Sequence, residues 1–169
     1  MKINIFGSTG NIGSKTLKLI ENNFPNIQIN LLTANKDFNK IYKQIKKYDP
    51  KYVYLDDIIS SEKLKKKIKS DVKILSKKEL SDYLLKSKSE LTILSIAGYK
   101  SLNFLEEIII NTDNLGLVSK EAIVSAGHLF KRKKYFYKTN IFPLDSEHFS
   151  LFNYLQNQSD INSIKKIYL

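Results

Sequence analysis

Two carboxylates near the end of the sequence have the types and spacing of a metal site. Asp145 and Glu147 flank Ser146, and all three follow Pro143 and Leu144. Both acids can turn toward one divalent cation, and their hard oxygen atoms suit Mg²⁺ or Mn²⁺. A cation held in this way keeps coordination positions for substrate oxygens and can polarise a carbonyl group. The acid pair therefore predicts metal-assisted chemistry.

Two further readings belong to the same segment. An Asp-x-Glu sequence is common and, taken alone, is usually structural. The neighbouring His148 is expected to pack against the acids rather than to bind the metal.

A glycine-rich turn near the N-terminus predicts a dinucleotide phosphate site. Gly7 lets the chain turn sharply, Gly10 lets the backbone approach a pyrophosphate, and Gly13 permits close helix-to-strand packing. The helix that follows would present free N–H groups to the anion. A plain tight turn is the alternative, but three of the six glycines fall within these seven positions. The full turn reads Gly7, Ser8, Thr9, Gly10, Asn11, Ile12, Gly13.

The end of the second predicted strand indicates which dinucleotide binds. An NAD-dependent enzyme usually places an acid there to bind the ribose 2′-hydroxyl. Here the strand leads into Asn35, Lys36 and Asp37. Lys36 is placed to pair with a 2′-phosphate, which favours NADP, although Lys36 could also be one of many surface lysines.

Predicted strands and helices alternate along the chain. Strands are expected at residues 3–6, 27–32, 52–55, 72–75, 91–96, 115–118 and 141–144. Helices are expected at 14–23, 39–48, 60–70, 76–87, 102–110 and 120–130, and Ser76 with Glu79 predicts a capping box. This repetition indicates an α/β fold, a Rossmann-like doubly wound parallel sheet with helices on both faces. The acid pair would then lie at the carboxyl edge of the sheet, where such folds bind ligands.

The composition gives a basic chain with a formal net charge of +11. Nucleic-acid readers cluster their charge and use arginine, whereas Arg132 is the sole arginine here. No specific nucleic-acid partner is expected, and the charge should attract phosphorylated ligands. The lack of cysteine excludes disulfides and thiolate metal sites. No apolar run is long enough for a membrane span, and cytoplasm is the default location.

Three motifs in this order resemble 1-deoxy-D-xylulose 5-phosphate reductoisomerases. They are the glycine turn, the segment 117–122 (Leu-Val-Ser-Lys-Glu-Ala) and the segment 142–148 (Phe-Pro-Leu-Asp-Ser-Glu-His). The resemblance covers essentially the whole chain, and the Pro-x-Asp-Ser-Glu-His run is specific to that family. Its members convert 1-deoxy-D-xylulose 5-phosphate to 2-C-methyl-D-erythritol 4-phosphate in non-mevalonate isoprenoid biosynthesis, using NADPH and a divalent metal.

The resemblance implies a role for each matching residue. Lys120 and Glu147 would be catalytic, and Lys120, Ser146 and Glu147 would contact the phosphorylated sugar substrate. Asp145 and Glu147 would bind Mn²⁺ or Mg²⁺. NADPH would contact the glycine turn and the end of the second strand, and would lie along one further segment. These cofactor residues are Gly7, Ser8, Thr9, Gly10, Asn11, Ile12, Gly13, Asn35, Lys36, Asp37, Ser119 and Glu121.

Family members are more than twice as long as this sequence, which predicts that the chain is an N-terminal portion. Residues 1–144 would form the NADPH-binding domain, and residues 145–169 would begin an incomplete catalytic domain. The isolated chain would then bind cofactor weakly and show no turnover. The resemblance implies that complete family members are homodimers. The oligomeric state of this shorter chain stays open.

Two other functions stay open from the sequence. The chain could be another NADP-dependent Rossmann reductase in which Asp145 and Glu147 are structural. It could also be a basic, non-catalytic binding module that uses the lysine-rich helix at 63–69 and the charge run at 131–134.

Overall fold

A sheet of seven parallel strands forms the centre of the computed structural model, which describes residues 1–130, 138–158, 162 and 164–167. The strand order is β4-β3-β2-β1-β5-β6-β7. Strands β2 to β4 therefore follow one another on one side of β1, and β5 to β7 on the other side. This confirms the predicted doubly wound sheet. The strands are β1 (Lys2–Phe6), β2 (Gln28–Ala34), β3 (Tyr52–Leu55), β4 (Lys73–Leu75), β5 (Ser89–Leu94), β6 (Thr112–Leu117) and β7 (Asn140–Pro143).

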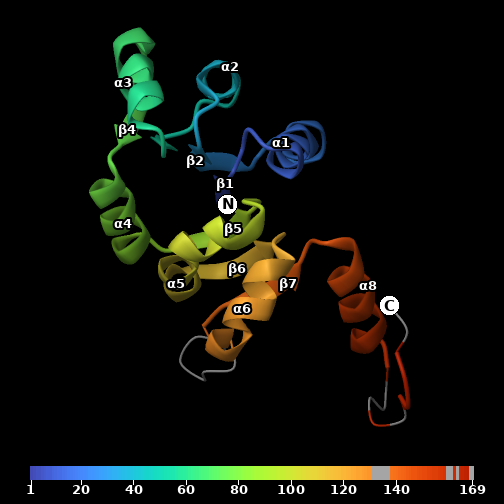
Figure 1. Ribbon diagram of the computed structural model, residues 1–169. Helices are drawn as coiled ribbons and strands as arrows, with labels where there is room; N and C mark the ends of the chain where they lie inside the picture. The colour runs from blue at the N-terminus through green and yellow to red at the C-terminus, as the bar shows by residue number, and fades with distance from the viewer. Residues whose placement is uncertain (131–137, 159–161, 163, 168–169) are drawn as a thin grey trace.

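Helices cover both faces of the sheet (Figure 1). Side chains alternate along a strand, so Ile5 of β1 packs in one apolar layer and Phe6 in the other. The Ile5 layer includes residues of α1 to α3, and the Phe6 layer includes residues of α4 to α6. The helices are α1 (Asn11–Asn23), α2 (Phe38–Tyr48), α3 (Ile58–Lys67), α4 (Lys77–Lys86), α5 (Leu102–Asn111) and α6 (Lys120–Phe130), with a short 3₁₀ helix η1 (Gly98–Ser101).

Local capping sets where several helices begin. The predicted capping box at α4 is confirmed: the Ser76 N–H donates to Glu79 at 2.9 Å, and the Glu79 N–H donates to the Ser76 hydroxyl at 3.3 Å. Asp57 caps α3 by accepting from the Ser60 N–H at 2.8 Å. Each cap satisfies a backbone donor that the helix itself leaves unpaired.

Some predicted bounds were wrong, for physical reasons. The strands predicted at 91–96 and 115–118 begin earlier, because Ser89 and Thr112 are buried and contact each other through their hydroxyls at 2.8 Å. A search for apolar runs does not detect such polar strand residues. The helix predicted to reach residue 70 ends at Lys67, because Ile68 is already extended.

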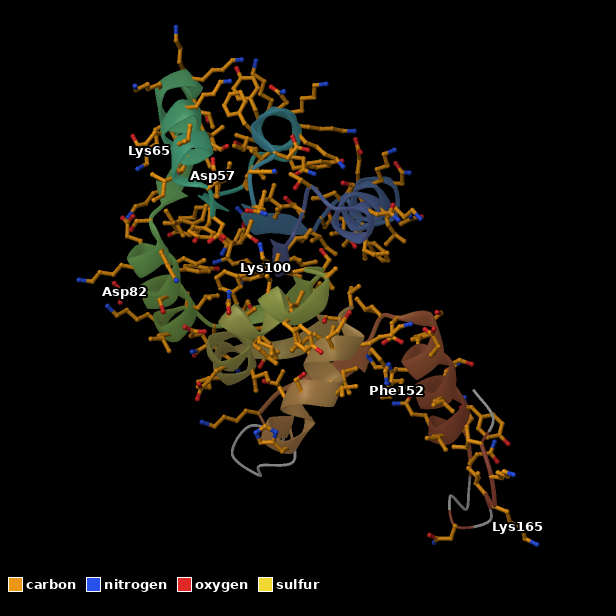
Figure 2. The ribbon with its side chains drawn as sticks, in the orientation of Figure 1. Asp57, Lys65, Asp82, Lys100, Phe152 and Lys165 are labelled. Atoms are coloured by element: carbon orange, nitrogen blue, oxygen red, sulfur yellow. The ribbon has the colours of Figure 1, made fainter. Side chains whose placement is uncertain are left out.

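The sequence did not predict helix α8 (Ser146–Gln156), which follows β7. None of its residues is buried, so the helix adds no side chain to the apolar core. It contacts β7 through Phe152, whose ring lies 5.9 Å from that of Phe142 (Figure 2). Residues 164–167 have no regular structure. Positions 163 and 168–169 lie outside the described residues, as does the charge run at 131–134.

Candidate functional site

The turn after β1 has the conformation that its glycines allow. Gly7 has a φ of +74°, and a Cβ there would lie 2.8 Å from the Ser95 carbonyl oxygen. The Gly10 N–H donates to the Gly7 carbonyl at 2.9 Å, which closes the turn. Among the described residues, no side chain caps α1 at Gly10. The first N–H groups of α1 are therefore available to an anion.

Side chains of helix α2 hold this turn through hydrogen bonds. The Ser8 hydroxyl donates to the Gln44 side chain at 2.8 Å, and the Gln44 amide donates to the Ser8 carbonyl at 2.8 Å. Lys40 donates to the Thr9 carbonyl. Sequence reasoning missed Gln44, although a polar residue beside Ile41 and Ile45 on a buried helix face was a usable signal. Ser8 is buried, and its two hydrogen bonds with Gln44 hold the turn in place.

A pocket of about 290 Å³ opens beside the turn, at the carboxyl edge of the sheet. It lies where the strand order reverses between β1 and β5, which is where doubly wound folds bind ligands. Its walls come from the glycine turn, from the ends of β2, β3 and β5, and from η1 and α5. The lining residues are Gly7, Thr9, Gly10, Thr33, Ala34, Asn35, Tyr54, Asp56, Ser95, Ile96, Ala97, Lys100, Asn103 and Phe104.

The structure separates the three residues predicted at the end of β2. Of the described neighbours Asn35, Lys36 and Asp37, only Asn35 lines the pocket. Asp37 caps α2 by accepting from the Lys40 N–H at 3.0 Å. Lys36 is exposed, and its carbonyl accepts from the Ser60 hydroxyl at 3.1 Å.

Ser119 and Glu121 lie at the start of α6, behind the pocket wall. The Ser119 hydroxyl is 3.2 Å from the Gly98 carbonyl, and it accepts from the Ala122 N–H at 3.3 Å. It also lies 2.9 Å from the Glu121 carboxylate. A backbone hydrogen bond from its own N–H and the Ser119 hydroxyl lower the pKa of Glu121. Ser119 therefore connects α6 to η1, the segment that borders the pocket.

The predicted acid pair lies at the N-terminus of α8. Asp145 caps this helix by accepting from the His148 N–H at 2.9 Å. The His148 ring nitrogen Nδ1 lies 2.9 and 3.0 Å from the two Asp145 oxygens, so His148 packs against the acids as expected. Glu147 pairs with Lys120 at 2.6 Å and accepts from the Ser146 hydroxyl at 2.7 Å. The structure thus brings together the four residues predicted for metal and substrate.

The Lys120–Glu147 contact is an ion pair of two charged groups. The Lys120 ammonium and then the Ser146 hydroxyl lower the pKa of Glu147 to about 2. The Glu147 carboxylate in turn raises the pKa of Lys120. Both groups are therefore charged at neutral pH.

The acid pair fits part of a hard-metal site. Mg²⁺ commonly takes one or two carboxylates and completes its shell with water and substrate oxygens. Within the described residues, no three His, Cys, Asp or Glu side chains are placed so that they could hold one metal ion, so Asp145 and Glu147 would supply only part of the shell.

A glycine turn and a pocket at the point of strand reversal are features of nucleotide-binding α/β folds. The family model for 1-deoxy-D-xylulose 5-phosphate reductoisomerase matches residues 3–127. The chain belongs to this family.

Individual relatives agree with the family model. The reductoisomerase of Pelagibacter ubique (strain HTCC1062) is 36% identical over 173 residues, covering 99% of this chain and 44% of that protein. A reductoisomerase structure from Zymomonas mobilis, in complex with NADPH, is 29% identical with a TM-score of 0.77, covering 87% of this chain and 39% of that one. A DOX-P reductoisomerase structure with fosmidomycin and magnesium is 25% identical with a TM-score of 0.78, covering 88% and 38%. The chain spans less than half the length of these relatives.

The Lys120–Glu147 pair predicts that the Glu147 carboxylate stays ionised at acidic pH. Because its pKa is lowered from an ordinary 4.5, the pair stabilises the fold above that pH and loses this effect as the pH falls through about 2. We expect Lys120→Gln to raise the Glu147 pKa toward 4.5, as measured by carboxyl-carbon NMR titration. Lys65→Gln, which removes the partner of Glu62 instead, should leave Glu147 unchanged. An unaltered Glu147 titration in Lys120→Gln would contradict this pairing.

Proposed function

We propose that this chain provides the NADPH-binding part of an enzyme that converts 1-deoxy-D-xylulose 5-phosphate to 2-C-methyl-D-erythritol 4-phosphate. The observation that carries the proposal is the pocket between the glycine turn and the point of strand reversal, in a chain of the reductoisomerase family. The Zymomonas mobilis relative in complex with NADPH supports the choice of cofactor. The reaction belongs to non-mevalonate isoprenoid biosynthesis.

In this proposal the cofactor lies along the carboxyl edge of the sheet. The free N–H groups at Asn11 and Ile12 bind the pyrophosphate, and Thr9 and Gly10 contact it from the turn. Gly7, Ser8 and Gly13 act through the shape of the turn. The adenosine half extends toward Asn35, and Ser119 and Glu121 lie along the other half. Lys36 and Asp37 as cofactor contacts stay predictions.

The metal and substrate would occupy the other end of the same edge. Asp145 and Glu147 would hold Mg²⁺ or Mn²⁺, which supplies a Lewis acid for a substrate oxygen. Lys120 and Ser146 lie beside Glu147 and would contact the phosphorylated sugar. Holding these groups on one rigid edge is how the fold would orient substrate against cofactor.

Residues 1–144 as the cofactor domain and 145–169 as the start of a catalytic domain form part of this proposal. The end of β7 and the start of α8 fall at this boundary. The oligomeric state of this chain stays open, and a cytoplasmic location stays a prediction. In the part of the chain that the structure describes, no helix is long and apolar enough to span a membrane.

A basic binding module is the second candidate function, and one observation bears on it. Lysines of α2 and α3 pack over aromatic rings of α2, with Lys63 4.8 Å from the Phe38 ring and Lys46 and Lys67 each 4.8 Å from the Tyr42 ring. These contacts are also typical of a solvated basic face. RNA binding that survives physiological salt would favour the module, whereas a steep loss with salt would indicate nonspecific charge.

An NADPH titration of the 169-residue chain tests the proposed cofactor site. We expect binding to the unmodified chain and about tenfold weaker binding to Gly10→Ala, because one lost phosphate contact is worth about that factor. A Cβ at Gly10 would lie 3.2 Å from the Gly7 carbonyl, a tight contact with the backbone of the turn, and would narrow the approach to that backbone. Gly127→Ala is the matched control, since a Cβ there meets nothing within 4 Å.

Calorimetry measures both affinities, and circular dichroism checks that each variant is folded. Failure of the folded, unmodified chain to bind NADPH would overturn the proposal. Equal affinity of Gly10→Ala and Gly127→Ala would place the cofactor elsewhere.

Paramagnetic broadening by Mn²⁺ tests the proposed metal site. The ion should broaden the side-chain resonances of Asp145 and Glu147 before those of Glu62, an exposed acid in α3 with its own lysine partner. Glu147→Gln should remove this selectivity, because a neutral amide is a poorer ligand for a hard cation. Equal broadening of all three acids would count against a metal site.

A further inference from the structure

Helix η1 contributes a lysine, Lys100, to the wall of the pocket. Lys100 is an exposed residue of η1, in the segment that follows β5 (Figure 2). It lines the same pocket as Thr9 and Gly10 of the glycine turn and Asn35 of the β2 end. Of the described residues that line this pocket, Lys100 alone carries a positive charge and Asp56 alone a negative one.

The charge of Lys100 is not neutralised by a neighbouring acid. Within the described part of the chain, no carboxylate lies within ion-pair distance of its ammonium group. Asp56 instead accepts a hydrogen bond from the Tyr54 hydroxyl at 2.8 Å. Burial, and then the bond to Asp56, raise the pKa of Tyr54 well above its ordinary value, so Tyr54 remains a neutral donor.

The backbone that carries Lys100 is held by two serines. The buried Ser101 hydroxyl donates to the Gly98 carbonyl at 2.7 Å. The Ser119 hydroxyl of the α6 start lies 3.2 Å from the same carbonyl. Gly98 itself has a φ of +70°, a conformation that favours glycine. η1 is thereby fixed to α6, and Lys100 is presented at a defined place on the pocket wall.

The proposed ligand needs such a cation. A dinucleotide with a 2′-phosphate carries several negative charges, and the turn offers neutral N–H groups. Lys40 already donates to the Thr9 carbonyl, and the exposed Lys36 lies outside the pocket lining. We propose that Lys100 pairs with a phosphate group of the bound dinucleotide and so contributes to cofactor affinity. This inference rests on the proposed function and adds a residue that sequence reasoning had not selected.

The test compares NADPH and NADH binding to three variants of the 169-residue chain by calorimetry at one salt concentration. Lys100→Gln removes the charge, and Lys100→Arg keeps it. Lys66→Gln removes an equal charge from an exposed position on α3, outside the pocket lining. We expect Lys100→Gln to bind NADPH about tenfold more weakly than Lys66→Gln does, with Lys100→Arg close to the unmodified chain.

The two cofactors identify the phosphate. An equal loss of NADPH and NADH affinity in Lys100→Gln supports a contact with the pyrophosphate, which both share. A loss confined to NADPH supports a contact with the 2′-phosphate. If Lys100→Gln matches Lys66→Gln for both cofactors while the unmodified chain binds NADPH, the inference is overturned and the proposed function stands. No NADPH binding by the unmodified chain overturns both.

Discussion

The site depends on how closely α1 approaches the turn that precedes it. Gly13 makes this possible, because a Cβ at that position would lie 2.4 Å from the Gly7 carbonyl oxygen and 2.7 Å from the Ser8 Cα. Real side chains do not reach such distances, so any larger residue would push the helix away from the sheet. With glycine there, the free end of α1 points at the pocket, and Ser8 stays within reach of Gln44. The anion site is thus a consequence of backbone packing.

The acid pair depends on the same sheet edge. β7 ends beside β6, where the Leu144 N–H donates to the Leu117 carbonyl at 2.7 Å. This brings α8 and its Asp145 cap next to the start of α6, where Lys120 meets Glu147. Each carboxylate therefore contacts a nitrogen donor, Asp145 the His148 N–H and Glu147 the Lys120 ammonium.

Much of this architecture was predictable from the sequence, because β1, β2, β3, β5 and β6 carry apolar residues that the sheet buries. Both chemical motifs were predictable because glycine spacing and paired acids are local signals. Helix α8 was not, since it buries no residue. The strand starts at Ser89 and Thr112 were also missed, because hydroxyls pair there instead of apolar side chains.

The site residues that the sequence analysis did not predict share one property. Gln44, Tyr54 and Lys100 reach the turn or the pocket from elements distant in the sequence, so only the folded sheet brings them together. Lys36 stays a predicted cofactor contact, although its neighbour Asn35 is the one that lines the pocket. Spacing along a chain indicates which strand end a residue follows, but not which way the side chain turns after it.

The central claim is that NADPH occupies the pocket at the point between β1 and β5 where the strand order reverses. The most direct measurement is a residue-resolved NMR titration of the chain with NADPH, following backbone amide shifts. The account predicts saturable shifts at the glycine turn and at the ends of β2 and β5, represented by Gly10, Asn35 and Ile96. Shifts confined to the lysines of α2 and α3, such as Lys46 and Lys67, would instead show binding to the basic face and would contradict it.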